Sequence, residues 1–281
     1  MNGKKGVIFC DIAGTLSFQD KHNNMNKWRD VGNGFVSLTD PITQKDILVL
    51  QTLVQNYHMY TDPITIHLLS MVKKLYHLVY VTGSRPSSVE SLKSVLIAPD
   101  ATLMESGATI CLDGYGGVDE DWYTIITAQV KELVKFIIKI KAEGWILDDK
   151  GRTSAVRIFP EQNPAKSKDD FSELEKRVLE TQPSLKTTWN IGGLDIVPKS
   201  AGKGNAVRYY MEKIGCAPKE TIGIGDDIND MEMFDVVNER LVVRSAHEEI
   251  LKIANANNWH ISSKVHFAGI NEILTLILHR S

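Results

Sequence analysis

The sequence has little cysteine and little excess charge. Its three cysteines, Cys10, Cys111 and Cys216, are far apart among 281 residues and have no Cys-x-x-Cys spacing. This usage argues against a disulfide framework. Cys10 and Cys111 lie in apolar runs, so we expect them to be buried thiols, and a reducing cytoplasm fits best. The formal net charge of −3 gives no reason to expect nucleic acid or an anionic membrane as a partner.

Long apolar runs are also missing. No stretch approaches transmembrane length, and the apolar run near the first residue is too short for a signal peptide. The hydrophobic content of 43% and the charged content of 24% are ordinary for a soluble globular protein. A chain of this length has room for one large domain or two smaller ones.

Short apolar runs, bounded by turn residues, alternate with segments of helical periodicity. The expected strands are residues 6–10, 77–83, 101–106, 221–227 and 240–245, and the expected helices are residues 61–76, 202–215, 245–257 and 267–281. Alternation of this kind predicts a mostly parallel sheet covered on both faces. We therefore expect an α/β protein with a Rossmann-like core.

The middle of the chain has a different pattern. A helix is expected at residues 124–144, strands at 145–149 and 153–159, a second helix at 168–182, and strands at 185–191 and 194–198. This α-β-β pattern, repeated twice, predicts a smaller α+β cap domain at residues 113–197, inserted into a core of residues 1–112 and 198–281. Glycine-rich segments at 112–117 and 198–204 would be the two linkers of a hinged lid.

Residues 17–61 are the part of the chain with the weakest pattern. Their first half is polar and resembles a loop, whereas residues 44–60 favour a helix. Two interpretations stay open for residues 17–61: they form a surface insertion without a role at the site, or they help to close the site over a substrate.

Four polar clusters follow expected strands or begin an expected helix. They are Asp11 to Thr15, the segment from Thr82, Lys203 between two glycines, and residues 223–230. The carboxyl ends of parallel strands are where open α/β sheets bind ligands. Each cluster has a plain structural alternative, such as a helix cap or a surface lysine. Their joint occurrence in this order favours one shared site.

These clusters resemble the motifs of the haloacid dehalogenase superfamily of phosphohydrolases. The order of elements at 113–197 resembles its type-2 cap, in the subgroup of trehalose-phosphate, sucrose-phosphate and mannosyl-phosphoglycerate phosphatases and phosphomannomutase. Residues 105–109 resemble the segment that leads into the cap in one branch. Residues 148–158 and 193–207 resemble the trehalose-phosphate phosphatase pattern most.

The resemblance implies a Mg²⁺-dependent phosphatase that acts on a phosphate monoester, most simply a sugar phosphate, through an aspartyl-phosphate. Asp11 would be the nucleophile, with the backbone carbonyl of Ala13 and the carboxylates of Asp226 and Asp230 beside it at the metal. Thr82 and Lys203 would hold the phosphoryl oxygens. The further residues expected at the substrate are Gly83, Ser84, Arg85, Lys150, Arg152, Arg157 and Asn229. Trp189 and Asn190 are weaker candidates for lining a sugar site.

Ala13 departs from the family motif. In the family, the residue at this position is a carboxylic acid that protonates the leaving alkoxide. This chain should therefore bind substrate and Mg²⁺ but hydrolyse the substrate poorly. We favour an inactivating Asp-to-Ala change, because every other motif is intact. A natural sugar-phosphate-binding pseudo-phosphatase is the second interpretation. Phosphonatase-like chemistry is the third, and the position of the cap fits it poorly.

A phosphosugar mutase is the rival enzyme, since it shares the cap subgroup. The sequence predicts a small phosphorylated molecule as partner, without nucleic acid or membrane, and leaves the sugar and the oligomeric state open.

Overall fold

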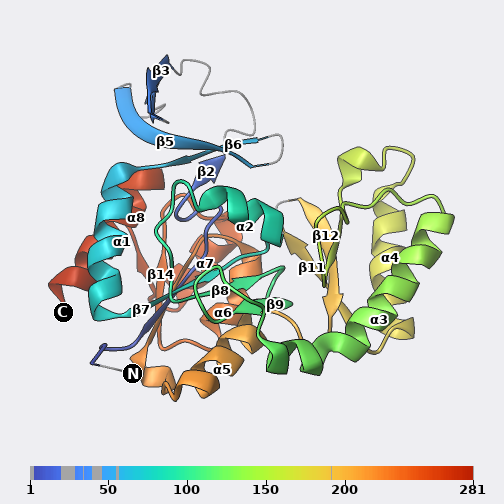
Figure 1. Cartoon of the computed structure of the whole chain (residues 1–281). Helices are drawn as coiled ribbons and strands as arrows, with labels where there is room; N and C mark the ends of the chain where they lie inside the picture. Colours follow the sequence, from blue (N-terminus) through green and yellow to red (C-terminus); the bar gives the residue numbers. More distant parts are fainter. Residues whose placement is uncertain are drawn as a thin grey trace.

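The computed structural model describes residues 3–19, 29–33, 35–39, 46–54, 57–190 and 192–280. Their strands form a seven-stranded, a three-stranded and a five-stranded sheet. Figure 1 shows the largest sheet in the middle, the three-stranded sheet with two helices to its right, and the five-stranded sheet above. No helix among the described residues is both long and apolar enough to cross a membrane.

The seven-stranded sheet has the order β15-β14-β13-β1-β7-β8-β9. Every neighbouring pair is parallel except β8 and β9, which run antiparallel at one edge. Its strands are β1 (Val7–Cys10), β7 (His77–Val81), β8 (Ala101–Met104), β9 (Thr109–Cys111), β13 (Thr221–Gly225), β14 (Glu239–Val242) and β15 (His260–Ile261). This arrangement confirms the predicted α/β class with a mostly parallel, Rossmann-like sheet.

Helices pack around this sheet. They are α1 (Pro63–Leu75), α2 (Pro86–Leu92), α5 (Lys203–Ile214), α6 (Met231–Phe234), α7 (Glu248–Ala256) and α8 (His266–His279). The side chain of Asp62 caps α1 by accepting from the Ile64 N–H, and Pro63 fits the first turn because that turn needs no N–H donor. α1 and α8 lie side by side (Figure 1).

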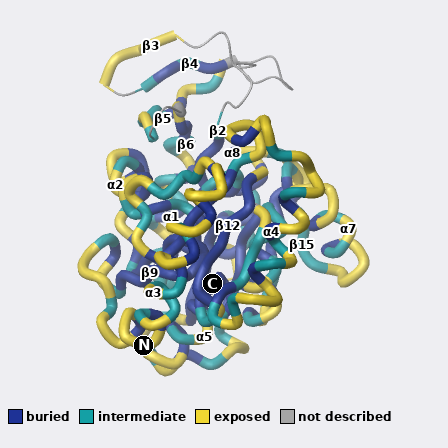
Figure 2. Tube along the Cα trace, turned by 90° about the vertical axis from the view of Figure 1, so that its right-hand side faces the viewer, coloured by how far each residue is buried: buried dark blue, intermediate teal, exposed yellow. Residues whose placement is uncertain are grey.

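The interior around the central sheet is mainly apolar. All four residues of β1 and all five of β13 are buried, as expected for parallel strands covered on both faces. Figure 2 shows that the buried segments of the chain lie at the centre of the molecule, with exposed turns around them. Cys10 and Cys111 are free, buried thiols, as predicted, and Cys216 is a third free, buried thiol.

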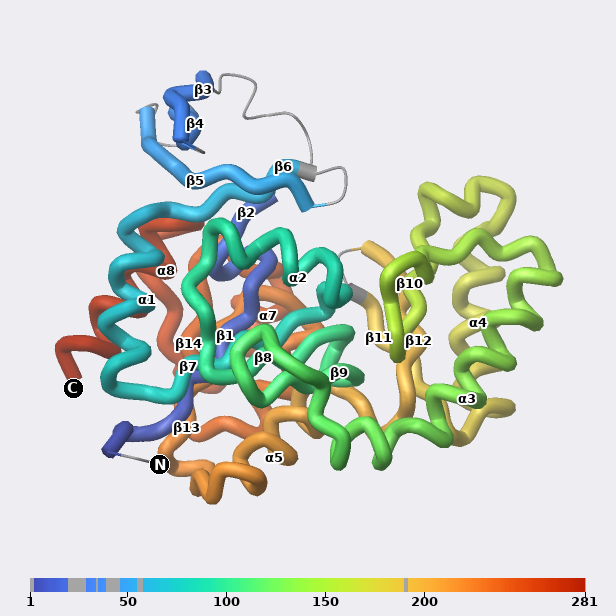
Figure 3. Tube along the Cα trace, in the orientation of Figure 1, coloured from blue at the N-terminus to red at the C-terminus, as the bar shows by residue number. Residues whose placement is uncertain are grey.

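The second unit consists of α3 (Glu120–Ala142), β10 (Val156–Ile158), the short 3₁₀ helix η1 (Pro160–Gln162), α4 (Lys168–Thr181), β11 (Leu185–Asn190) and β12 (Gly193–Pro198). Its antiparallel sheet has the order β10-β12-β11, and a separate apolar core forms beneath it. Figure 3 shows the chain leaving the central sheet after β9 for α3 and returning after β12 to α5. We keep the boundaries at 113 and 197 as a proposal.

The strand expected at residues 145–149 is wrong. Within it only Asp148 makes an isolated bridge, to Arg157. Trp145 instead packs edge-on against Phe171, and the Asn163 side chain bonds both the N–H and the C=O of Ile146. The side-chain amide therefore takes the backbone partners that a neighbouring strand would have used.

The helix expected at residues 44–60 is also wrong. The described residues there form β5 (Asp46–Val54) and the start of β6 (Tyr57–Thr61), in a sheet of order β2-β6-β5-β4-β3. Its other strands are β2 (Phe18–Gln19), β3 (Arg29–Gly32) and β4 (Phe35–Thr39). A short apolar run fits both periodicities, and pairing with β4 and β6 decides for the strand. Residues 20–28, 34, 40–45 and 55–56 lie outside the described residues.

Candidate active site

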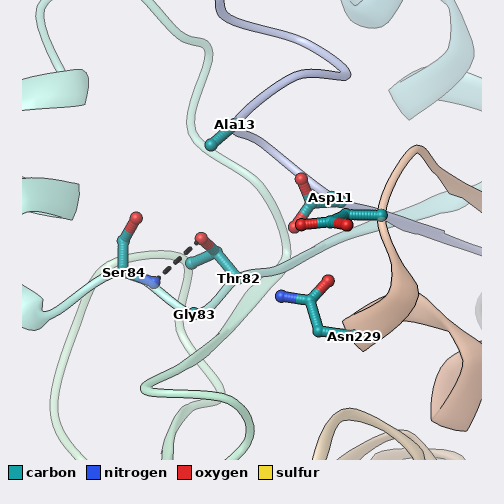
Figure 4. A pocket seen from close by; sticks show the side chains of 7 residues that line it. Asp11, Ala13, Thr82, Gly83, Ser84 and Asn229 are labelled. Atoms are coloured by element: carbon teal, nitrogen blue, oxygen red, sulfur yellow. Dashed lines mark hydrogen bonds between the residues drawn. The ribbon is translucent and has the colours of Figure 1, made fainter. Parts of the chain in front are cut away.

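Three neighbouring strand ends form the centre of the site. β1 lies between β13 and β7, so that Cys10 is level with both Ile224 and Tyr80. The next residue, Asp11, donates its N–H to the Ile224 carbonyl at 2.9 Å. The register therefore brings Asp11, Thr82 and Asp226 to one edge of the sheet, as predicted from their places in the sequence. Figure 4 shows Asp11, Ala13, Thr82 and Asn229 around one opening.

Lys203 reaches this edge from the first turn of α5. Its ammonium donates to Asp11 Oδ1 at 2.6 Å, to Asp230 Oδ1 at 2.5 Å and to Asn229 Oδ1 at 3.3 Å. The side chain is only 2% exposed. Three donors on three acceptors satisfy the ammonium fully, which is what burial of a charge requires.

Asp226 and Asp230 come from the loop after β13. Asp230 Oδ2 accepts the N–H groups of Asp226 and Asp227 at 3.0 and 3.1 Å, which fixes the loop, and Thr15 donates to Asp226 Oδ1 at 2.6 Å. Gly14 has a φ of 94°, and a Cβ there would overlap the Asp226 carboxylate. Only glycine allows the two loops to approach this closely.

The site holds more negative than positive charge. Burial, opposed by Lys203 and reinforced by Asp230, raises the pKa of Asp11 to about 7. Burial, with Asp11 and Asp230 nearby, also raises the pKa of Asp226 well above its usual value. Although burial alone would lower it, the pKa of Lys203 is raised by Asp11 and Asp230. The single positive charge of Lys203 therefore does not neutralise the carboxylates of Asp11, Asp226 and Asp230.

The donor atoms suit a hard divalent cation. One carboxylate oxygen from each of Asp11, Asp226 and Asp230 lies within 4.8 Å of the others. Mg²⁺ prefers oxygen ligands, and its positive charge would favour the ionised form of Asp11 and Asp226, whose pKa values are raised by burial and, to a lesser extent, by neighbouring carboxylates. These residues fit the predicted metal. That the Ala13 carbonyl joins them stays a prediction.

A small hollow opens beside Asp11. Its lining consists of Asp11, Ala13, Thr82, Gly83, Ser84, Asp227 and Asn229. The Ser84 N–H donates to Thr82 Oγ1 at 3.1 Å, so the loop after β7 is ordered around its hydroxyl (Figure 4). Besides Asp11, five residues predicted for the site thus line one space: Ala13, Thr82, Gly83, Ser84 and Asn229.

The basic side chains predicted at the substrate lie elsewhere. Arg85 forms an ion pair with Asp148 and donates to the Lys150 carbonyl. Arg152 lies 3.4 Å from the same Asp148 carboxylate. These contacts join α2 of the core to the cap, and none of the three basic residues lines the hollow.

Arg157 belongs to the cap sheet. It is buried and holds Asp195 through two hydrogen bonds of 2.5 and 2.7 Å. The other cap candidate, Trp189, is 40% exposed. The side chain of Asn190 is not among those that the structure describes.

Sequence reasoning missed Glu105 as a link between core and cap. Its buried carboxylate accepts the Thr153 N–H at 2.9 Å, the Thr153 hydroxyl at 2.6 Å and the Ser154 N–H at 3.1 Å. The segment was noted only for its resemblance to a cap-entry motif. A single glutamate carries no signal for such long-range partners.

A family model described as sucrose-6F-phosphate phosphohydrolase matches residues 51–276. Two similar curated proteins are probable sucrose-phosphatase 2 of Arabidopsis thaliana, 29% identical over 65% of this chain, and sucrose-phosphatase 2 of Nicotiana tabacum, 28% identical over 64%. The aligned parts are 44% and 45% of those proteins, so the chain matches less than half of their length.

Solved structures agree on the fold. The sucrose-phosphatase of Synechocystis sp. PCC6803, solved with sucrose and phosphate, superposes with a TM-score of 0.68 at 18% identity, over 98% of both chains. A haloacid dehalogenase-like hydrolase of Bacillus subtilis gives 0.58 at 17% identity, over 98% of this chain and 93% of its own. The family match is to the sucrose-phosphate member of the predicted subgroup, whereas the sequence pattern had favoured the trehalose-phosphate member.

Proposed function

Because the chain belongs to the sucrose-6F-phosphate phosphohydrolase family of haloacid dehalogenase-type phosphoric monoester hydrolases, we propose that it binds a phosphorylated sugar and cleaves its phosphate ester. The observation that carries this proposal is the contact of Lys203 with both Asp11 and Asp230, next to a hollow that Asp11 lines. A nucleophilic carboxylate, a fixed cation and an adjoining space are what phosphoryl transfer to a side chain needs.

Each residue has a role in this proposal. Asp11 attacks phosphorus and takes the phosphoryl group, while the P–O bond to the sugar breaks. Lys203 and the Thr82 loop hold the phosphoryl oxygens as negative charge moves onto the leaving oxygen. Asp230 orients Lys203 and fixes the loop of Asp226. Water then attacks the aspartyl-phosphate and regenerates Asp11.

Asp11, Asp226 and Asp230 would hold Mg²⁺. When bound, the ion supplies positive charge that offsets repulsion between a phosphate dianion and Asp11. We also keep the cytoplasm as the proposed compartment, on the three free thiols.

Ala13 makes the proposed turnover slow. The alanine side chain lines the hollow but has no proton to give to a sugar alkoxide or take from water. Binding relies on other residues, so it should be intact. This observation also favours a second candidate function, a sugar-phosphate-binding protein that does not turn its ligand over.

One comparison separates the two functions. The chain and its Ala13→Asp variant are incubated with sucrose 6-phosphate, trehalose 6-phosphate and glucose 6-phosphate, with and without Mg²⁺. Phosphate release that appears only in the variant and only with Mg²⁺ supports the enzyme. Tight binding of a sugar phosphate by both proteins, without release by either, supports the binding protein, and sugar isomerisation without release supports a mutase.

A further inference from the structure

Three short segments contact one another beside the hollow that Asp11 lines. The first is the Thr82 loop (residues 82–85), three residues of which line the hollow. The second is the Glu105 turn (residues 105–107) of the core, and the third is the cap segment (residues 148–154). Each lies far from the others in the sequence, so only the tertiary structure brings them into contact.

The Glu105 turn holds the Thr82 loop through its backbone. The N–H of Glu105 donates to the Ser84 carbonyl at 3.0 Å, and the N–H of Ser106 donates to the Thr82 carbonyl at 3.1 Å. Glu105, Ser106 and Gly107 have consecutive φ values of 52°, 55° and 83°, a conformation that residues with a Cβ rarely adopt. The hydrogen bonds to the loop help to maintain this strain, and strain that surrounding contacts maintain is typical of functional sites.

The side chain of Glu105 holds the cap segment. Glu105 is 0% exposed, and the donors to its carboxylate among the described residues are all neutral. They are the hydroxyl of Thr109 at 2.8 Å, the hydroxyl and the N–H of Thr153 at 2.6 and 2.9 Å, and the N–H of Ser154 at 3.1 Å. A buried carboxylate that only neutral groups contact depends on every one of its donors. All but Thr109 belong to the cap, so Glu105 keeps its full set of partners only while the cap segment is docked.

The cap segment also contacts the Thr82 loop directly. The Arg85 guanidinium pairs with Asp148 and donates to the Lys150 carbonyl. Arg152 Nη1 lies 3.5 Å from the carbonyl oxygen of Gly83, which lines the hollow. Each of the three segments is therefore in polar contact with the other two. In a closed network of this kind the contacts support one another, so the loop, the turn and the cap segment are ordered together.

We infer that Glu105 is a positioning residue for the Thr82 loop. By docking the cap segment, its carboxylate closes the network that holds the loop in the conformation found here. Neither Glu105 nor Thr153 lines the hollow beside Asp11, so their effect on a phosphate there passes through the loop. The inference rests on the proposed function, because the Thr82 loop must be the place where phosphate binds.

Thermodynamic linkage makes two consequences measurable. If docking of the cap segment orders the loop for phosphate, phosphate bound at the loop stabilises docking by the same factor. Coupling between two sites typically changes an affinity about 5- to 150-fold. Inorganic phosphate is the probe, because it has no alcohol group that could contact the cap.

The first measurement is calorimetric titration of the full chain with inorganic phosphate at a fixed Mg²⁺ concentration. Glu105→Ala removes the acceptor and should weaken phosphate binding about fivefold or more. Thr153→Val removes one donor at nearly constant size and should weaken it at least about twofold. Thr153→Ser keeps the hydroxyl and should bind phosphate as the original chain does. Glu173→Ala and Thr124→Val, exposed on α4 and α3, are the matched controls and should change the affinity less than about twofold.

The second measurement is amide hydrogen exchange of the original chain in Mg²⁺, with and without saturating inorganic phosphate. Phosphate should slow exchange at residues 148–154 about fivefold or more, since exchange there requires undocking. Residues 171–178 of α4 belong to the cap but not to the cap segment, and their exchange should not change. If Glu105 only stabilised the fold, its loss would lower the Tm without either effect of phosphate.

Either of two results would overturn the positioning role while leaving the proposed function standing. One is that phosphate binds equally tightly to the original chain, to Glu105→Ala and to Thr153→Val. The other is that phosphate binds but leaves exchange at residues 148–154 unchanged. If Glu105→Ala does not fold, the comparison of Thr153→Val with Thr153→Ser decides. If inorganic phosphate does not bind to the original chain at all, the proposed function is wrong, and this inference with it.

Discussion

Lys203 Nζ lies 2.6 Å from Asp11 Oδ1, although 192 positions separate the two residues in the chain. The pair is buried, and Asp230 contacts the same ammonium from a third segment. A charge buried this deeply is stable only with its partners. The contact therefore ties β1, the start of α5 and the loop after β13 into one site.

Restoring the missing carboxylate is the first prediction. Ala13→Asp should raise Mg²⁺-dependent release of phosphate from the best-bound sugar phosphate by about 10²–10⁴-fold, because a positioned acid and base assists both half-reactions. A phosphate-release assay measures it. Ala13→Asn, which has the size but no titratable proton, is the control and should stay slow. Equal rates in the two variants would argue against acid–base help at this place.

The nucleophile is tested in the Ala13→Asp background. Asp11→Asn should lower turnover at least ~10³-fold, since the amide is a poor nucleophile and a poor metal ligand. Asp169→Asn, on the exposed first turn of α4, is the matched control and should leave the rate unchanged. Retention of a tenth of the activity by the Asp11 variant would exclude the assignment.

Removal of Lys203 should destabilise the metal-free protein. Lys203→Met leaves Asp11 and Asp230 buried without their cation, and loss of one member of such a pair costs about 3–5 kcal/mol. Urea unfolding measures the free energy. Lys252→Met, which breaks an exposed pair with Glu248, should cost less than about 1 kcal/mol. Equal costs for the two variants would show that the buried network contributes nothing.

Stabilisation by Mg²⁺ should depend on pH. The pKa of Asp11 in the folded, metal-free protein is about 7, above its unfolded value near 3.9, so stability present at low pH is lost as pH rises towards 7. Mg²⁺ requires the ionised form and competes with the proton. The gain in Tm from Mg²⁺ should therefore be larger at pH 8 than at pH 5, as measured by calorimetry.

Asp226→Asn supplies the control for that experiment. Loss of this carboxylate should remove most of the rise in Tm that Mg²⁺ causes at pH 5 and at pH 8, because the cluster of three carboxylate oxygens is then incomplete. If the rise in Tm with Mg²⁺ is the same at pH 5 and pH 8, or if the Asp226→Asn variant still shows it, the ion binds at another site.

The link between core and cap gives the last prediction. Glu105→Gln replaces one acceptor oxygen with an NH₂ group that faces the donors of Thr153 and Ser154. Amide hydrogen exchange at residues 152–155 should then become at least about fivefold faster. Loss of the acceptor leaves buried donors without a partner, which lowers the free energy of local opening of this segment. Glu132→Gln on the exposed side of α3 should have no effect there. Unchanged exchange in the Glu105 variant would show that other contacts hold the cap.

The sequence alone determined the central sheet and the place of the site within it. Short apolar runs such as Val7–Cys10, which alternate with helical segments, predict buried parallel strands, and polar residues that directly follow such strands are expected to meet at one edge of the sheet. Together with the resemblance of the four motifs to those of haloacid dehalogenases, this pattern predicts that Asp11, Thr82, Lys203, Asp226 and Asp230 belong to one site.

Tertiary structure alone decided the remaining features. Asp46–Val54 fits a helix or a strand by pattern, and its pairing with two other strands selects the strand. Three arginines have the chemistry of phosphate binders but form ion pairs instead: Asp148 pairs with Arg85 and Arg152, and Asp195 pairs with Arg157. Arg85 and Arg157 are distant in sequence from their partners. The contact between Glu105 and the cap depends on a strained turn that hydrogen bonds to the Thr82 loop hold in place. Such outcomes depend on which distant groups meet, and local sequence does not contain that information.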